Sequence, residues 1–137
     1  MSHTRTFAAF TLLAGLSLFG QATKGAWWSR PAIKDLDLSR QQMREMRQTV
    51  QEYRPRLQEL RAAVQKAEQD LENEFNRDQV DAQKANAVID RLVAARADLS
   101  RTLSQMGLKL RMFLTGQQWQ EVEKRFPPKA AKRSGAN

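Results

Sequence analysis

The sequence contains no cysteine, and its single histidine, His3, lies close to the N-terminus. Without cysteine the fold has no disulfide, so apolar packing has to hold it together. The shortage of both residue types also removes the usual nucleophiles, general bases and soft metal ligands. The sequence has no glycine-rich phosphate loop, and its acidic residues are scattered along helix faces. We therefore expect a protein that is not an enzyme, uses no cofactor and holds no metal.

Residues 1–26 have the pattern of a secretory signal peptide. Arg5 provides a positive start, residues 7–19 are largely apolar, and cleavage is plausible after Ala22 or Ala26. This run of thirteen residues is shorter than the ~20 that a membrane-spanning helix needs. The alternatives are an uncleaved membrane anchor and a buried helix. A lipoprotein anchor is excluded, because no cysteine follows the apolar run. The pattern predicts export from the cytoplasm.

The chain is basic, with 23 Lys and Arg residues against 15 Asp and Glu residues and a net charge of +8. Removing the leader, with Arg5 and Lys24, would leave 21 basic residues and a charge of +6. In the cytoplasm such a charge would suggest nucleic acid. An exported chain meets acidic protein surfaces, anionic lipids or envelope polymers instead, and we expect no nucleic-acid partner. Solubility alone would also explain the charge.

Two long apolar rows have helical spacing, and no segment alternates with the period of a strand. We call these rows the first and the second seam, and they predict helices over residues 40–75 and 79–113. The first seam comprises Met43, Met46, Val50, Tyr53, Leu57, Leu60, Val64, Ala67, Leu71 and Phe75. The second seam comprises Ala85, Val88, Leu92, Ala95, Leu99, Leu103, Met106, Leu110 and Phe113.

Three features interrupt these helices. Pro55 predicts a kink or a short break, because an internal proline loses a hydrogen bond and clashes with the preceding turn. The alternative is two separate helices, 40–53 and 56–75. Residues 73–78 form the best turn candidate, with Asp78 as the next N-cap. Gly107 should weaken the second helix by up to about 1 kcal/mol relative to alanine.

The chain outside the long helices divides into three short parts. Residues 27–37 form an arm in which Pro31 and the lack of periodicity argue against helix. A short helix is expected over residues 116–125, ended by a Pro-Pro pair. The expected domain therefore covers residues 38–126, and the basic tail, residues 127–137, should be disordered.

A turn of a few residues would make the long helices antiparallel neighbours, so the expected fold is an all-α hairpin with short flanking helices. A two-helix hairpin has little interior, and its seams leave apolar surface open. We therefore expect a partner, most simply a second copy of the chain. Trp27 and Trp28 either dock onto this hairpin, which we favour, or contact a client or a membrane interface.

Two copies of the pattern Leu-[Ser/Thr]-x-x-Gln lie near opposite ends of the expected domain. In each copy the hydroxyl residue is an N-cap and the glutamine stands at N3, so the pair predicts a capping box. The leucine before the cap would pack on Met43 in the first copy and on Trp119 in the second, as a hydrophobic staple. The motif residues are Leu38, Ser39, Gln42, Leu114, Thr115 and Gln118.

With the leader and the basic helical chain, these motifs resemble those of the Spy/CpxP family of bacterial periplasmic proteins. Leu114 to Gln118 matches the family's LTxxQ motif fully, and Leu38 to Gln42 has serine in place of threonine. The resemblance covers roughly residues 36–126. It implies a periplasmic location and a thin, curved, four-helix protomer that pairs into an antiparallel, cradle-like homodimer.

The resemblance also implies a function. Members include ATP-independent chaperones that bind unfolded envelope proteins on a basic, partly apolar face. Others are stress-response modulators that act on the periplasmic domain of a sensor kinase. Metal-binding relatives similar to ZraP and CnrX rely on histidine sites, which residues 27–137 lack. We expect a chaperone or envelope-stress modulator; a heavy-metal resistance or sensing protein and a structural coiled-coil adaptor for a membrane protein are the alternatives.

Arginines follow one flank of the first seam, at positions 40, 44, 47, 54 and 61, and the last three are seven residues apart. Such a row could pair with acidic segments of a client while the seam binds its apolar groups. It could also be a solvated flank, or pair with Glu45, Glu52 and Glu59. Met43 and Met46 are adaptable apolar side chains, more typical of a core or interface than of a thioether copper(I) site. The candidate client-binding residues are Arg44, Arg47, Arg54, Arg61, Met43 and Met46.

Overall fold

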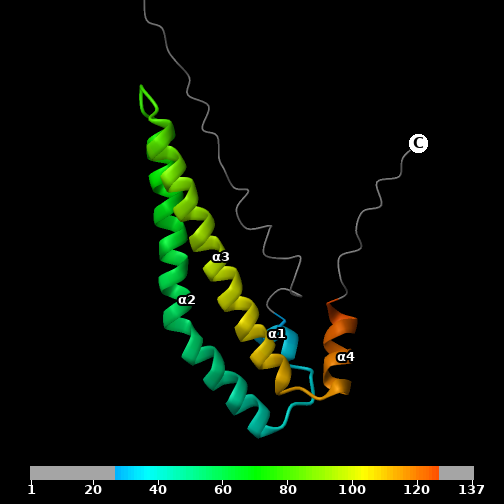
Figure 1. Cartoon of the computed structure of the whole chain (residues 1–137). Helices are drawn as coiled ribbons and strands as arrows, with labels where there is room; N and C mark the ends of the chain where they lie inside the picture. The colour runs from blue at the N-terminus through cyan, green and yellow to red at the C-terminus, as the bar shows by residue number, and fades with distance from the viewer. Residues whose placement is uncertain (1–26, 127–137) are drawn as a thin grey trace, which may run out of the picture.

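The described chain consists of helices and loops. The structure is a computed structural model that describes residues 27–126, so the expectations for residues 1–26 and 127–137 lie outside it. Figure 1 shows two long helices side by side as a hairpin, with the short helices α1 and α4 near its open end. The predicted all-α hairpin with short flanking helices is confirmed. The helices are α1 (Arg30–Ile33), α2 (Arg40–Phe75), α3 (Ala82–Met112) and α4 (Gly116–Arg125).

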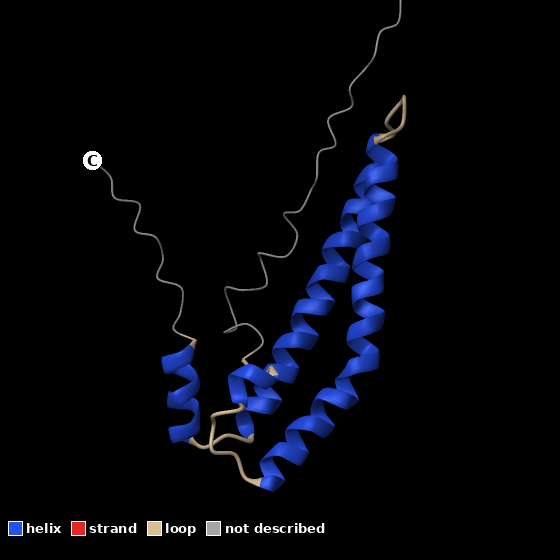
Figure 2. Cartoon of the chain, turned by 180° about the vertical axis from the view of Figure 1, so that it is seen from behind, coloured by secondary structure: helices blue, strands red, loops and turns tan. Residues whose placement is uncertain are grey.

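Helix α2 is continuous although Pro55 lies inside it. Figures 1 and 2 both show α2 bent partway along its length. The missing N–H and the steric demand of a proline ring are the usual causes of such a bend. The alternative of two helices, 40–53 and 56–75, is wrong. The first seam keeps its phase across the proline, so packing holds both limbs of α2 in one helix.

The turn between the long helices lies later than predicted. The N-cap of α3 is Asp81 rather than Asp78, and its carboxylate accepts from the backbone N–H groups of the second and third helical residues at 3.0 and 3.2 Å. The predicted Asp78 cap and the predicted helix start at 79 are therefore wrong, and the predicted turn at residues 73–78 overlaps the observed loop at residues 76–78. If α3 began at residue 79, it would gain one more helical turn, but that helical turn would contain no seam residue. Val80 there is 53% exposed, so no burial favours that turn.

The arm contains one helical turn, α1, where helix was not expected. Pro31 occupies its first turn, in which a backbone N–H has no helical acceptor to lose. The N–H of Ile33 donates to the carbonyl of Ser29 at 3.2 Å and closes the turn. The same residue type that bends α2 from inside is thus compatible with the start of α1.

The two seams pack against each other as the core of the hairpin. Burial of each large apolar side chain stabilises the fold by roughly 1.5–3 kcal/mol. In the first seam the two ends stay open: Met43 is 42% exposed near the arm, and Phe75 is 56% exposed at the turn. The buried members are Met46, Leu57, Leu60 and Ala67 of α2, with Ala85, Val88, Leu92, Leu99, Met106 and Leu110 of α3.

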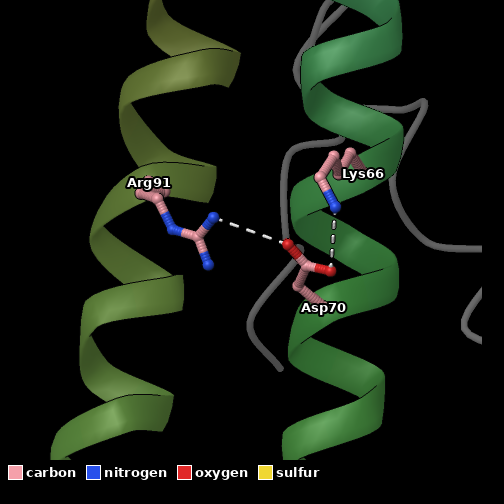
Figure 3. A network of polar contacts seen from close by, with 3 residues as sticks. All are labelled: Lys66, Asp70 and Arg91. Carbon is pink, nitrogen blue, oxygen red and sulfur yellow. Dashed lines mark hydrogen bonds and ion pairs between the residues drawn. The ribbon is translucent and has the colours of Figure 1, made fainter.

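Charged pairs connect the two long helices toward the end of the hairpin that carries the turn. Asp70 of α2 pairs with Arg91 of α3 and with Lys66 of its own helix, each at 3.5 Å (Figure 3). Glu68 and Arg96 lie 2.7 Å apart. Exposed pairs of this kind contribute about 0–1 kcal/mol each. They therefore help to set the register of the hairpin, whereas the seams supply most of its stability.

Tryptophans tie the arm to the open end of the hairpin. Trp27 is 3% exposed and meets Trp28 and Trp119 edge to face, with ring centroids 5.8 and 5.3 Å away. A Cβ atom at Gly107 would lie 3.4 Å from Cζ3 of Trp28, so the glycine leaves room for the indole on α3. The predicted docking of Trp27 and Trp28 onto the hairpin is confirmed.

We expect Gly107→Ala to raise the free energy of unfolding by up to about 1 kcal/mol, because alanine favours helix and its methyl group would only reach ordinary contact with Trp28. Gly107→Val is the comparison: its larger, branched side chain must displace the indole and lower stability. Thermal unfolding followed by circular dichroism measures both. A large loss of stability in the alanine variant would contradict the packing of the arm.

Candidate functional site

Both motif copies cap helices. The hydroxyl of Ser39 accepts from the backbone N–H of Gln42 at 3.0 Å, and the backbone N–H of Ser39 donates to Oε1 of Gln42 at 2.9 Å. In the second copy the hydroxyl of Thr115 accepts from the N–H of Gln118 at 3.2 Å, and the reverse bond is 2.9 Å long. The motifs therefore define where α2 and α4 begin.

The two motif glutamines also bind each other, a contact that was not predicted. Nε2 of Gln42 donates to Oε1 of Gln118 at 2.8 Å, and Nε2 of Gln118 donates back to Oε1 of Gln42 at 3.1 Å. Each amide also reaches the other copy's backbone: Gln42 donates to the carbonyl of Phe113 at 2.8 Å, and Gln118 to that of Asp37 at 2.9 Å. Both carbonyls stand directly before a motif leucine. The copies are thus related by a local pseudo-twofold arrangement, which we call the glutamine clamp.

The clamp needs an amide at both positions. Glutamine donates two hydrogen bonds and accepts two, and each clamp residue uses both donors and an oxygen that accepts twice. A capping box by itself accepts Glu as readily as Gln. Glutamine in both copies was therefore the sequence signal that the amide nitrogens also have partners.

We expect the clamp to act as a unit. Gln42→Ala and Gln118→Ala should each lower the free energy of unfolding by about 2 kcal/mol, since each removes several hydrogen bonds worth about 1 kcal/mol apiece. Thr115→Ala, which removes only a cap, should cost about 0.5–2 kcal/mol. Urea unfolding of both single variants and the double variant gives the coupling. Losses that add to within about 0.5 kcal/mol would show two independent caps and no clamp.

An open groove of about 1010 Å³ lies between the arm and the limb of α2 that precedes Pro55. Its lining is largely apolar, with cationic side chains from α2, and Leu110 of α3 also contributes. From α2 come Met43, Met46, Arg47, Val50, Gln51 and Arg54. From the arm and its junction with α2 come Trp28, Ser29, Ile33, Lys34, Asp35, Leu36, Asp37 and Leu38.

The structure brings together part of the predicted client-binding set. Arg44 and Arg61 are exposed on α2 but lie outside the groove lining. Met46 is 4% exposed and belongs to the core, whereas Met43 is 42% exposed and can be reached from the groove. The predicted residues that line the groove are Met43, Met46, Arg47 and Arg54.

Arg47 and Arg54 form no ion pair or hydrogen bond with any other described residue. Three glutamates of α2 were the alternative partners, but their carboxylates bind other side chains at 2.9 to 3.3 Å. On the opposite wall, Asp35 pairs with Arg125 at 3.7 Å. The α2 wall of the groove is therefore cationic and open to an anionic partner. The glutamate contacts are Glu45 with Gln41, Glu52 with Lys109 and Glu59 with Arg56.

The described part of the chain has neither a cluster of metal ligands nor a membrane-spanning helix. Across residues 27–126, no group of three or more His, Cys, Asp or Glu side chains is placed to hold a metal ion. None of the helices in this range is long and apolar enough to cross a membrane. The groove is a place in the described part of the chain where apolar surface and unpaired charge lie side by side.

Comparison with protein families matches residues 7–121 to the family described as heavy-metal resistance. The match covers most of the chain, including both motif copies and the groove. This family lies within the Spy/CpxP/ZraP-like superfamily. No curated protein and no solved structure matches the chain.

Proposed function

The chain belongs to the heavy-metal resistance family, and from this premise we propose that it is a periplasmic, ATP-independent chaperone or envelope-stress modulator that binds polypeptides. The observation that supports this proposal is the groove, in which apolar side chains lie beside the unpaired charges of Arg47 and Arg54. The proposed clients are unfolded envelope proteins. A modulator would use the same surface for one folded partner, such as the periplasmic domain of a sensor kinase.

The chemistry of the groove suits reversible binding of polypeptides. Apolar groups of a client gain about 25 cal/mol for each Å² that they bury, and Met43 can adapt to differently shaped side chains. Guanidinium groups bind carboxylates with two parallel hydrogen bonds and attract acidic chains from a distance. Exposed ion pairs are individually weak. Clients can therefore leave the groove without ATP hydrolysis.

A second copy of the chain is part of the proposal. Val93 and Leu108 of α3 are 60% and 62% exposed, so the hairpin carries apolar surface that another protomer could cover. We propose the antiparallel homodimer that the family resemblance implies. Sedimentation at micromolar concentration tests it, and a monomer there would remove the dimer from the proposal without affecting the groove.

The description of the family favours a second function, the binding of heavy-metal ions. The donors of this chain fit that function poorly, because residues 27–137 contain neither histidine nor cysteine. A thioether site at Met43 and Met46 would suit copper(I) alone. Calorimetric titration with zinc, nickel and copper(I) decides the question. Tight, stoichiometric binding of any of them would replace the chaperone proposal.

The proposal predicts that Arg47→Glu with Arg54→Glu weakens the suppression of client aggregation without ATP. Roughly fivefold more protein should be needed for the same effect, since two exposed charge contacts are lost and reversed. The melting temperature should hardly change, because neither side chain has an ion pair in the described chain. Light scattering by a denatured model protein measures the effect.

Arg44→Glu with Arg61→Glu is the matched control. It makes the same change of charge on the same helix but lies outside the groove lining. This variant should suppress aggregation as well as the unmodified protein does. Equal activity of both double variants would mean that the groove is not the binding surface, and loss of activity in both would point to net charge alone.

A further inference from the structure

The α2 wall of the groove repeats itself after seven residues. Met43 and Arg47 form the first pair of an apolar and a cationic side chain, and Val50 and Arg54 form the second with the same offset of four. Seven residues advance a helix by about 10.5 Å and return to nearly the same side. The groove therefore offers two equivalent apolar and cationic positions about 10.5 Å apart.

A partner that contacts both positions must present matching side chains at the same distance along its backbone. Residues on one side of an extended strand recur every ~6.7 Å, so their spacings of about 6.7 and 13.4 Å miss the 10.5 Å repeat. A helix that lies along α2 presents residues i and i+7 at 10.5 Å on one face. Resting on the proposed polypeptide-binding function, we infer that the groove takes its partner as an amphipathic helix with acidic residues seven apart beside its apolar stripe.

The walls of the groove orient this helix. Its apolar stripe faces Met43 and Val50, and its acidic flank faces Arg47 and Arg54. The arm carries the carboxylates of Asp35 and Asp37 along with the ammonium group of Lys34. An acidic flank therefore gains less electrostatic attraction along the arm than along the α2 wall. The α2 part of the lining spans 11 residue steps, or about 16 Å, which corresponds to three helical turns. Apolar side chains at helical spacing are the usual anchors of a helix bound in a groove.

Labelled synthetic peptides of about 16 residues, without tryptophan, test this inference by fluorescence anisotropy with the purified protein. The first carries a leucine stripe flanked by Glu at positions i and i+7. The second has the same composition with both Glu residues moved to the polar face. The third keeps the Glu positions but contains two prolines that prevent helix formation. We expect the first to bind about tenfold more tightly than either control, since it alone aligns both contact types with the groove.

Charge reversal locates the binding. Arg47→Glu with Arg54→Glu should abolish the preference for the first peptide and favour its Lys-for-Glu counterpart. Arg44→Glu with Arg61→Glu should leave the order of affinities unchanged. A reversal of preference caused by the first pair of changes and not by the second would place the acidic flank on the α2 wall.

The outcomes separate this inference from the function on which it rests. If the proline-containing peptide binds as tightly as the helical one while aggregation is still suppressed, the groove binds extended chains and the inference is overturned. If the protein sediments as a dimer that Arg47→Glu with Arg54→Glu dissociates, and no peptide competes with the second copy, the inference is also overturned. If neither peptides nor denatured protein bind, the proposed function itself fails.

Discussion

The paired amides of Gln42 and Gln118 are the contact on which the open end of this molecule depends. Each caps its own helix, binds the other amide and reaches the backbone of the other motif copy. The arm, the start of α2, the end of α3 and the start of α4 therefore meet at one point (Figure 1). Because Asp37 of the arm supplies one of the acceptors, the clamp also holds the wall that faces Arg47 and Arg54 across the groove. Partial burial strengthens such a network and makes a missing member costly.

The parts of the fold that could be predicted are those with two independent local signals. The bounds of α2 match the prediction because the cap at Ser39 and the first seam agree. The start of α3 was missed because aspartate is an equally good N-cap at positions 78 and 81. Burial decides between the two caps, since Val80, which a helix begun after Asp78 would include, stays exposed. Helix α1 was missed because Pro31 and the lack of periodicity were taken as evidence against helix, although a proline is compatible with a first helical turn.

The site was only half predictable, for a different reason. The arginine row could be read from its spacing, but the residues that face the groove depend on the bend of α2 and on the position of the arm. The arm has no periodicity, and the contacts that hold it come from Trp119, Gly107 and Gln118, which are distant in the chain. Such contacts leave no pattern in a single sequence. The structure thus separates two groups of residues: the motif glutamines hold the open end of the hairpin together, and Arg47 and Arg54 of α2 line the groove without an ion pair in the described chain.

We propose that the groove held by the clamp is the surface that binds polypeptides. Amide hydrogen exchange of the whole protein, measured with and without a bound denatured client, tests it most directly. We expect slower exchange in the arm and in residues 43–54, with no change at the turn between α2 and α3. Slower exchange concentrated at that turn, where Phe75 and Val80 are exposed, with the arm and residues 43–54 unaffected, would contradict it.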